Sequence, residues 1–315
     1  MNKQFSQDIY DGLNSTPKTL PSKYFYNEIG DKLFQDIMAM PEYYLTRSED
    51  EIFREKSSEL TAKLNVTEST LFQILELGAG DGSKTVKFLA HLLKSDYQIE
   101  YLPLDISQNA LDGLKKKLED TLPSLQVKPI QGDYFHSIQS LKSSSTQKII
   151  LFLGSNMGNM NDQQAIEFLS QIASSMNSND KMILGLDQIK HTDIVLPAYN
   201  DAQGITRAFN LNLLTRINEE LGGNFILKNW GHDPSYDEIT GEAKSFLKSN
   251  VKQSVYIKSM DQTFHFDKNE LVQTEISRKY NDEILHGILE KAGLKLASKV
   301  MDSKEYFADC IIEKA

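Results

Sequence analysis

Between residues 71 and 190, short apolar runs of strand length alternate with longer amphipathic stretches of helix length. The expected strands are residues 71–77, 99–104, 127–130, 149–153 and 182–186, and the expected helices are residues 84–93, 108–122 and 162–176. Strands that alternate with helices form right-handed βαβ units, whose parallel sheet is covered by helices on both faces. The alternation therefore predicts an α/β fold with a mostly parallel, Rossmann-like sheet.

The sequence on either side of this segment has a different character. Residues 1–65 are predicted to be helical, including a helix over 31–40, and another helix is predicted over 206–221. Residues 224–274 alternate like antiparallel strands, a helix follows over 283–292, and two strands are expected within 294–313. We therefore expect two domains, residues 60–195 as the α/β domain and residues 1–59 plus 196–315 as a second, α+β domain.

Charge and cysteine content limit the possible partners. Lys and Arg number 34 and Asp and Glu 44, so the net charge of −10 disfavours nucleic acid and anionic membranes as partners. The single cysteine, Cys310, can form neither an internal disulfide nor a thiolate metal site, and the histidines lack zinc-motif spacing. The first residues do not resemble a signal peptide, and no apolar run is long enough to span a bilayer. We expect a cytoplasmic protein, a monomer without a metal, that acts on a small molecule.

A glycine-rich turn follows the first expected strand of the α/β domain. Positions 74–83 read ILELGAGDGS, an apolar strand that leads directly into glycines and then into a helix. Gly78 and Gly80 would allow the backbone to approach a ligand closely. Ser83 stands where a dinucleotide fingerprint has Gly or Ala, and Glu76 suits a cationic ligand better than a pyrophosphate. A nicotinamide oxidoreductase is therefore disfavoured but stays an alternative.

Acidic residues also end the next two expected strands. Asp105 follows the second strand, where a carboxylate can accept hydrogen bonds from both hydroxyls of a ribose. Asp133 and Tyr134 follow the third, where they offer an acid for an adenine amino group and an aromatic surface for its ring. Acids after successive strands, without a phosphate cradle, predict the S-adenosylmethionine site of a class I methyltransferase. The alternative is a Rossmann-like domain in which these acids have no role.

Small and polar residues follow the fourth expected strand. Positions 151–160 read LFLGSNMGNM, and methyltransferases usually display groups that face the methyl donor at this place. Asn159 could therefore contact a substrate. The alternative is that Asn156 and Asn159 only cap the helix that follows.

Several motifs resemble those of one known family, the S-adenosylmethionine-dependent histidine Nα-methyltransferases of ergothioneine biosynthesis. The matching segments, in a consistent order from about residue 20 to the C-terminus, are YFYNEIGDKLF at 24–34, PEYYLTR at 41–47, ELGAG at 76–80, LGS at 153–155, AFNLN at 208–212 and TEIS at 274–277. The motifs outside the glycine-rich turn are the specific ones, because generic methyltransferases lack them.

The resemblance implies a role for individual residues of this chain. It implies that the cofactor is bound by Glu76, Gly78, Gly80, Asp105, Asp133 and Tyr134. It implies that Asn159 and Tyr199 hold the carboxylate of the amino acid and that Tyr26, the catalytic candidate, lies beside the amine. Tyr43, Glu275 and Ser277 would hold the imidazole, since a carboxylate can accept from one ring N–H and a hydroxyl can complement the other nitrogen. The implied reaction is threefold methylation of the α-amino group of L-histidine to the betaine hercynine.

One position departs from the family pattern. Where characterised enzymes have a methionine near the side-chain pocket, this chain has Ser245, so the pocket could be larger. Another aromatic amino acid such as tryptophan is therefore an alternative substrate, and a non-catalytic sensor of S-adenosylmethionine or of an amino acid is a more distant one. Taken alone, the tyrosines could be core residues, and Glu275 could cap a helix or pair with Arg278 or Lys279.

Overall fold

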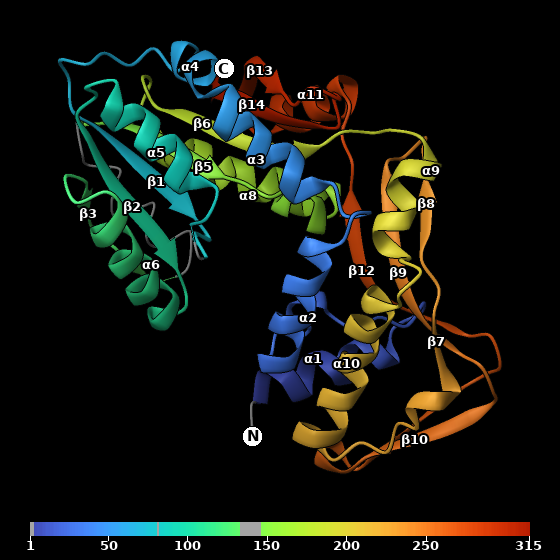
Figure 1. Cartoon of the computed structure of the whole chain (residues 1–315). Helices are drawn as coiled ribbons and strands as arrows, with labels where there is room; N and C mark the ends of the chain where they lie inside the picture. Colours follow the sequence, from blue (N-terminus) through green and yellow to red (C-terminus); the bar gives the residue numbers. More distant parts are fainter. Residues whose placement is uncertain (1–2, 81, 133–145) are drawn as a thin grey trace. The chain divides into compact units, whose positions relative to one another are not determined.

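The computed structural model describes residues 3–80, 82–132 and 146–315 (Figure 1). The chain forms two compact units. Unit 1 consists of Met1–Tyr44 and Lys190–Arg278, and unit 2 of Leu45–Ile189 and Lys279–Ala315. The chain thus crosses between the units at residues 44–45, 189–190 and 278–279.

Unit 2 is built on a mixed, mainly parallel sheet with the strand order β13-β14-β6-β5-β1-β2-β3, in which β4 also pairs with β2. The parallel strands are β1 (Phe72–Leu77), β2 (Ile99–Asp105), β3 (Gln126–Val127), β4 (Ile130–Gln131), β5 (Gln147–Phe152) and β6 (Lys181–Asp187). β13 (Leu294–Met301) and β14 (Phe307–Lys314) form an antiparallel hairpin, and β14 runs antiparallel to β6. The strand order reverses at β1, and in open α/β sheets ligands bind at the carboxyl ends of the strands at such a point.

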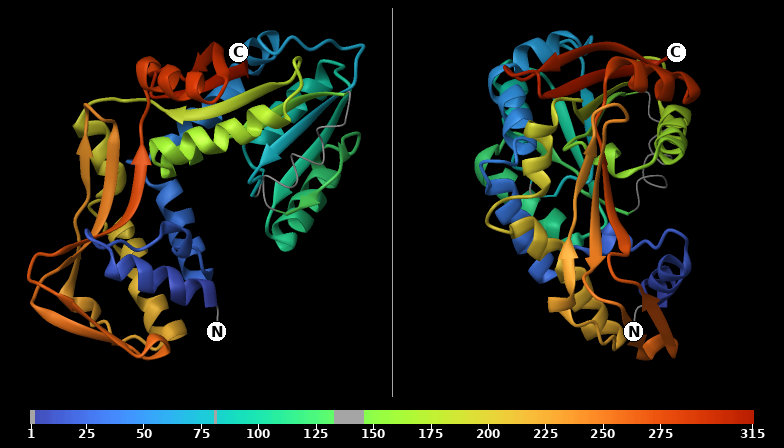
Figure 2. Two further views of the ribbon diagram at one scale, coloured as in Figure 1. Left: turned by 180° about the vertical axis from the view of Figure 1, so that it is seen from behind. Right: turned by 90° about the vertical axis from the view of Figure 1, so that its right-hand side faces the viewer.

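Helices cover both faces of this sheet (Figures 1 and 2). On one face α3 (Leu45–Glu55), α4 (Ser57–Ala62), α5 (Thr85–Lys94) and α6 (Gln108–Thr121) bury their apolar sides against β-strand residues such as Ile74 and Leu151. On the other face α8 (Asp162–Ser175) and α11 (Asp282–Lys291) pack against residues such as Ile150 and Phe152. Side chains from successive residues of β5 thus enter opposite cores, which explains its unbroken apolar sequence.

Unit 1 combines helices with an antiparallel sheet. Its helices are α1 (Lys3–Asn14), α2 (Glu28–Ala39), α9 (Thr192–Val195) and α10 (Ile205–Leu221), and the short 3₁₀ helices are Ser22–Tyr24, Leu196–Tyr199, Leu227–Asn229 and Lys258–Met260. The sheet has the order β12-β9-β7, with β8 also paired to β9, and consists of β7 (Trp230–His232), β8 (Ser235–Asp237), β9 (Glu242–Ser249) and β12 (Leu271–Arg278). β10 (Gln253–Ile257) and β11 (Gln262–Phe266) form a separate hairpin. α1, α2 and α10 share one apolar core with these strands.

The N-terminal segment completes the sheet of unit 1. Thr19 forms a parallel bridge with Gln273, the N–H of Leu20 donates to the Gln273 carbonyl at 2.8 Å, and the N–H of Gln273 donates to the Lys18 carbonyl at 3.0 Å. The first residues of the chain therefore lie beside β12, which belongs to its last fifth.

The α/β prediction is confirmed, but the grouping of the segments differs from the expected one. Residues 45–59 and 279–315 were expected in the α+β domain, which corresponds to unit 1. They belong instead to unit 2, which contains the α/β sheet. The reason is that α3 and α4 bury apolar residues against the parallel sheet, while β14 pairs with β6 and so extends that sheet. The strand expected over 127–130 is divided into β3 and β4, because Pro129 lies between them and has no N–H for a ladder.

Within residues 3–80, 82–132 and 146–315, none of the helices has the length and apolar character that crossing a membrane would require.

Candidate active site

The glycine-rich turn of unit 2 has a backbone that favours glycine. Gly78, Gly80 and Gly82 have φ values of 70°, 54° and 60°, in the left-handed region. A Cβ atom on Gly82 would lie 2.4 Å from Cδ1 of Leu114 on α6, so this glycine is needed for packing as well. Among the residues that the structure describes, in contrast, none lies within 4 Å of the Cβ position of Gly80. Gly80 therefore leaves open space at the carboxyl end of β1.

Asp105 supports this turn from the end of β2. One of its oxygens accepts the N–H of Gly80 at 3.3 Å, and the other accepts the N–H of Ser107 at 2.9 Å. Because each carboxylate oxygen has two lone pairs, Asp105 can accept further hydrogen bonds from a ligand. A pocket of about 260 Å³ lies next to it, lined by Gly80, Asn109, Ala110, Gly113, Leu114 and Lys117.

Glu76, near the carboxyl end of β1, lies in the protein interior. Its side-chain oxygens accept hydrogen bonds from Thr85 Oγ1 at 2.6 Å and from the Tyr101 hydroxyl. Burial raises the pKa of this carboxyl to about 7, although both hydroxyls and Lys84 act in the opposite direction. Glu76 thus ties β1 to β2 and to the start of α5, and its direct contact with a cofactor stays a prediction.

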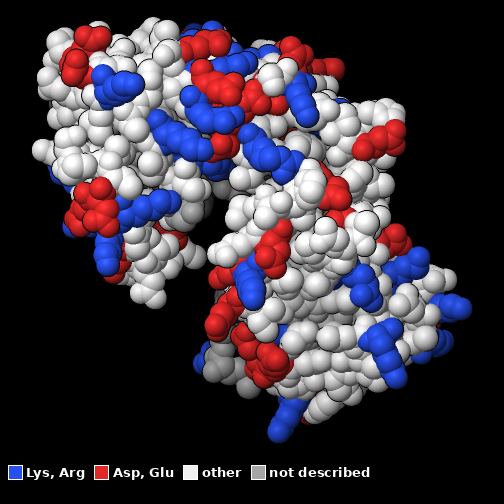
Figure 3. Space-filling model, viewed as in Figure 1, with Lys and Arg blue, Asp and Glu red and all other residues white. Residues whose placement is uncertain are grey.

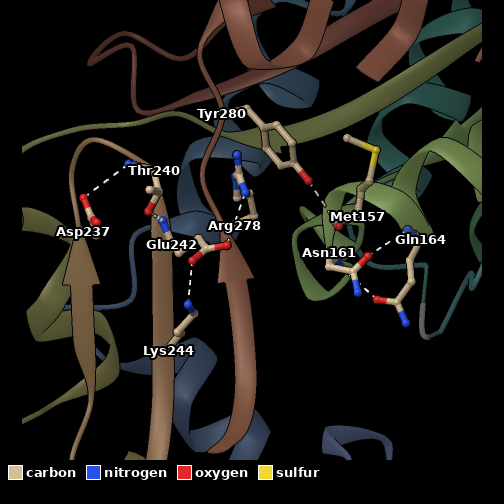
Figure 4. Close-up of polar contacts among 9 residues, drawn as sticks. All are labelled: Met157, Asn161, Gln164, Asp237, Thr240, Glu242, Lys244, Arg278 and Tyr280. Carbon is tan, nitrogen blue, oxygen red and sulfur yellow. Dashed lines mark hydrogen bonds and ion pairs between the residues drawn. The ribbon is translucent and has the colours of Figure 1, made fainter. Parts of the chain in front are cut away.

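The loop after β5 is fixed by three side chains of unit 2. Gly154 and Ser155 have positive φ values of 74° and 57°. Glu49 accepts the N–H of Gly154 at 2.7 Å, Ser155 Oγ accepts the N–H of Asp187 at 3.1 Å, and the Tyr280 hydroxyl donates to the Met157 carbonyl at 3.2 Å (Figure 4). The 3₁₀ helix Asn156–Asn159 is therefore held at both its start and its middle.

Asn159 does not cap the helix that follows this loop. The N-cap of α8 is Asn161, which forms a capping box with Gln164: Asn161 Oδ1 accepts the Gln164 N–H at 2.9 Å, and Gln164 Oε1 accepts the Asn161 N–H at 3.0 Å (Figure 4). The capping alternative for Asn156 and Asn159 is thus wrong. Asp133 and Tyr134, the predicted adenine contacts, lie outside the described residues.

In unit 1, the paired strands β9 and β12 bring three predicted residues to one face of the sheet. Glu275 lies opposite Ser245 and Ser277 opposite Ala243 in the strand register. Residues opposite each other, and residues two apart on one strand, point to the same face. The Tyr199 hydroxyl, at the end of the 3₁₀ helix Leu196–Tyr199, donates to Ser277 Oγ at 2.8 Å. Glu275 is a strand residue and does not cap a helix.

A bulge in β12 sets the direction of Glu275. The register between β12 and β9 shifts between Gln273 and Glu275, so Thr274 is the extra residue. The buried Thr274 hydroxyl lies 2.8 Å from Asn210 Oδ1 and 3.0 Å from the Ser245 carbonyl. Asn210 on α10 therefore holds the bulge that precedes the Glu275 carboxylate.

Tyr26 lies among aromatic rings of unit 1. Its ring centroid is 5.5 Å from that of Phe34 and 5.8 Å from that of Phe209, both in edge-on arrangements. Partial removal of the phenol from water raises the pKa of Tyr26, although 43% of the residue stays exposed, and the charges of Glu275 and Asp31 raise it further. The phenol therefore stays protonated at neutral pH. It also lies close enough to Glu275 for the two groups to interact electrostatically.

The segment after Tyr26 is fixed by α10. Asn27 is the N-cap of α2: its Oδ1 accepts the Gly30 N–H at 2.8 Å and a hydrogen bond from Asn212 Nδ2 at 2.9 Å. The two asparagines of the AFNLN motif thus have separate tasks, since Asn210 holds the bulge before Glu275 and Asn212 holds the backbone beside Tyr26.

Tyr43 and Asn159 complete the placement of the predicted residues. The Tyr43 ring lies 6.5 Å from Phe34, so it belongs to the same aromatic group of unit 1 as Tyr26. Asn159 lies in unit 2 and Tyr199 in unit 1. Their joint action on a carboxylate stays a prediction.

The opposite face of the β9–β12 pair carries an ion-pair network. Glu242 accepts from Arg278 at 3.3 Å and from Lys244 at 2.6 Å (Figure 4). Arg278 follows Glu275 by three residues on β12 and is paired with Glu242 on β9. The side chains of Arg278 and Glu242 therefore point to the face of the sheet opposite to that of Glu275.

The sequence analysis did not identify several residues that hold these sites, namely Glu49, Asn210, Asn212, Thr274 and Tyr280. Glu49 did carry a signal: in α3 the buried residues Leu45, Ser48, Glu49, Ile52 and Phe53 follow helical spacing, so an acid interrupts an otherwise buried face. Such an acid needs a partner inside the protein. Asn210, Asn212 and Thr274 lie in the quoted motifs and Tyr280 lies outside them, and only the tertiary structure reveals the partners of all four.

Comparison with known proteins gives a consistent result. Residues 5–314 match the family described as histidine-specific, S-adenosylmethionine-dependent methyltransferases. The histidine N-alpha-methyltransferases of Mycolicibacterium smegmatis and Mycobacterium tuberculosis are each 30% identical, over 92% and 91% of this chain and 88% of theirs. Ergothioneine biosynthesis protein 1 of Schizosaccharomyces pombe is 29% identical over 94% of this chain and 39% of its own length.

Proposed function

We propose that the chain, which belongs to the family of histidine-specific, S-adenosylmethionine-dependent methyltransferases, transfers methyl groups to the α-amino group of L-histidine. The observation that carries this proposal is the shared face of β9 and β12, where Glu275 and Ser277 offer the acceptor and donor atoms that an imidazole needs.

Unit 2 fits the methyl donor. The open space at Gly80 and the spare acceptor capacity of Asp105 lie beside the 260 Å³ pocket, where a ribose and its base can enter. S-adenosylmethionine would supply the methyl group of its sulfonium: a neutral amine attacks the methyl carbon in line, the S–C bond breaks, and S-adenosylhomocysteine leaves as a neutral thioether. The ammonium ion that forms loses a proton to water before the next transfer. The chain's task is therefore to bind, orient and exclude water.

On the acceptor side, Glu275 accepts a hydrogen bond from one imidazole nitrogen and Ser277 complements the other. Tyr26 binds the amine. Because the raised pKa keeps its phenol protonated, Tyr26 orients the amine by hydrogen bonding and does not remove the proton as a phenolate. Asn159 and Tyr199 bind the carboxylate of the amino acid. Tyr43 borders the imidazole.

We expect three successive transfers, ending in the trimethyl betaine. The rings of Tyr26, Phe34 and Phe209 lie within 6.0 Å of one another, and aromatic faces accommodate a growing quaternary ammonium group. Each transfer leaves the carboxylate and imidazole contacts unchanged, so the same site can serve all three.

We further propose a monomeric, cytoplasmic enzyme that acts on small molecules and not on nucleic acid. Basic and acidic side chains intermingle on the face shown in Figure 3, and the net charge is −10, which disfavours polyanions. Burial raises the pKa of the Cys310 thiol to about 12, so this lone cysteine stays a protonated core residue.

Another aromatic amino acid, such as tryptophan, is the second candidate substrate, and Ser245 favours it. This serine lies opposite Glu275 and is buried, and it is much smaller than the methionine of the family pattern. A larger side chain could occupy the volume that this exchange leaves.

The test is incubation of the protein with labelled S-adenosylmethionine and each amino acid singly, followed by product mass. Transfer of three methyl groups to histidine supports the proposal. Transfer to tryptophan instead selects the second candidate, and transfer to none of the amino acids contradicts both and leaves the sensor alternative.

A further inference from the structure

A buried cluster of charged groups in unit 2 lies outside the roles assigned so far. Its centre is Glu49 on α3, whose side chain has no exposed surface. One oxygen of Glu49 accepts the N–H of Gly154 at 2.7 Å, and the other forms an ion pair with Lys84, the residue that immediately precedes α5. A single carboxylate thus joins the loop after β5 to the end of the glycine-rich turn after β1.

The sheet has a vacant side-chain position that accommodates this carboxylate. Gly185 lies inside the buried strand β6, and a Cβ atom there would be 2.2 Å from Oε1 of Glu49. Glycine inside a strand is unfavourable unless another group approaches closely. Here the approaching group is the Glu49 carboxylate.

A second buried carboxyl belongs to the same cluster. Asp309 on β14 is paired with Gly185 in the strand register and has no exposed surface. Within the described part of the chain, neither of its side-chain oxygens has a hydrogen-bond partner. Burial raises the pKa of Asp309 well above its usual value, the charge of Glu49 adds to this, and Lys84 opposes it. Asp309 is therefore protonated, and the cluster holds one anion and one cation.

We propose that Glu49 is a positioning residue for the methyl transfer proposed above, because its carboxylate fixes Lys84 and Gly154 together at the carboxyl ends of β1 and β5. Asp309 is the reserve counterion of the cluster. It stays neutral while Glu49 is ionised, and it ionises when the charge of Glu49 is removed, since the Lys84 ammonium group, whose side chain is 23% exposed, has then lost the carboxylate with which it pairs.

The charged groups that face Asp309 determine which residues respond to a change at Glu49. Glu49 on α3 and Lys84 before α5 are the charged groups that act on it, and Glu76 on β1 acts on Lys84. Cys310, the next residue of β14, is a protonated thiol. A change in the charge of Glu49 is therefore felt by Lys84, Asp309 and Glu76, and the Glu76 titration, which the parent shares, is the baseline against which the variants are compared.

The experiment measures binding of S-adenosylhomocysteine by calorimetry between about pH 5.5 and 8.5, with variants Glu49→Gln, Asp309→Asn and the double variant. Asp309→Asn should match the parent, because an amide replaces a neutral carboxyl group. Glu49→Gln should weaken binding about tenfold near pH 8. Its affinity should fall further as pH drops, because Asp309 then protonates and Lys84 loses its counterion.

The double variant should bind weakly over the whole range without this additional pH dependence. The matched control is Asp180→Asn, which removes the partner of Lys148 from an ion pair near the start of β5 and β6 that is buried on both sides, whereas in the Glu49 pair only the carboxylate is fully buried. It should lower the stability of the protein and leave ligand affinity unchanged. A purely structural role of Glu49 predicts that Glu49→Gln behaves like Asp180→Asn.

Parental affinity and parental pH dependence in Glu49→Gln would overturn the inference, as would the same additional pH dependence in the double variant. The measurement needs no amino acid, so it separates this inference from the histidine assignment. If the parent protein fails to methylate histidine while the variants follow the expected binding pattern, the proposed substrate is wrong and the role of Glu49 stands.

Discussion

Replacement of Glu275 by glutamine tests the acceptor site with the least change in shape. Glu275 is partly buried on the face of β12 that also carries Ser277, and its position is set by the Thr274 bulge. The amide of Glu275→Gln fills the same volume but is a weaker, uncharged acceptor. Only the interaction with an imidazole N–H should change substantially.

The structure indicates the size of the effect. A hydrogen bond to a charged group contributes about 1.5–3 kcal/mol, and the lower part of that range applies because Glu275 retains contact with water. Since about 1.4 kcal/mol corresponds to a factor of ten, the dissociation constant of L-histidine should rise about 10- to 30-fold. Cofactor affinity should not change, because Asp105 and the glycine-rich turn belong to unit 2.

Calorimetric titration with L-histidine, in the presence of saturating S-adenosylhomocysteine, measures this difference. The matched control is Glu242→Gln, which removes an acid from the opposite face of the same strand pair, where Arg278 and Lys244 bind it. The control should bind histidine like the parent. Parental affinity in Glu275→Gln, or an equal loss in both variants, would refute the assignment of the imidazole site.

Three further perturbations test other parts of the molecule. Asp105→Ala should weaken S-adenosylmethionine binding about tenfold or more, because a charged acceptor of hydrogen bonds is lost, and unchanged affinity in calorimetry would contradict the ribose role. In the folded protein the pKa of Glu76 is about 7, above its usual 4.5, so between these pH values the carboxyl group is more protonated in the folded than in the unfolded chain. Its contribution to the free energy of unfolding therefore falls as pH rises from 4.5 to 7. Glu76→Gln should therefore remove that loss, about 3 kcal/mol at most, and be relatively more stable at pH 8 than at pH 4.5 in urea unfolding; an unaltered pH dependence would contradict the buried-acid reasoning. Asn210→Ala should cost about 1–3 kcal/mol and lower kcat/KM for histidine, because Thr274 loses a buried partner; lost stability with unchanged kcat/KM would show that another contact holds the bulge.

The elements of the α/β part could be predicted because their periodicity is local. Four of the five strands expected between residues 71 and 190 are present as single strands, since β1, β2, β5 and β6 are buried on both faces and so have continuous apolar sequences, and the strand expected over 127–130 is divided into β3 and β4. The assignment of segments to units was less successful. Whether β14 pairs with β6 depends on a contact between residues more than 100 positions apart, and no local pattern contains that information.

The residues of the candidate site also fall into those that the sequence indicates and those that it does not. The glycine-rich turn and Asp105 could be found from spacing alone, and their geometry fits the expectation. The side chains that hold the site in place could not be found in this way. Asn210 holds Thr274 across 64 positions and Glu49 holds Gly154 across 105, and in each case neither segment indicates which residue is the partner.

The strand β12 has an unusual position in the chain. Glu275 and Ser277 lie in unit 1, and directly after Arg278 the chain enters unit 2, where Lys279 forms a fully buried ion pair with Asp187 at 2.9 Å and Tyr280 binds the Met157 carbonyl. An insertion or deletion of one residue between Ser277 and Lys279 would either turn the pocket side chains to the opposite face or remove Lys279 from its partner. At this strand, exchange of side chains at fixed length should therefore be tolerated better than a change of length.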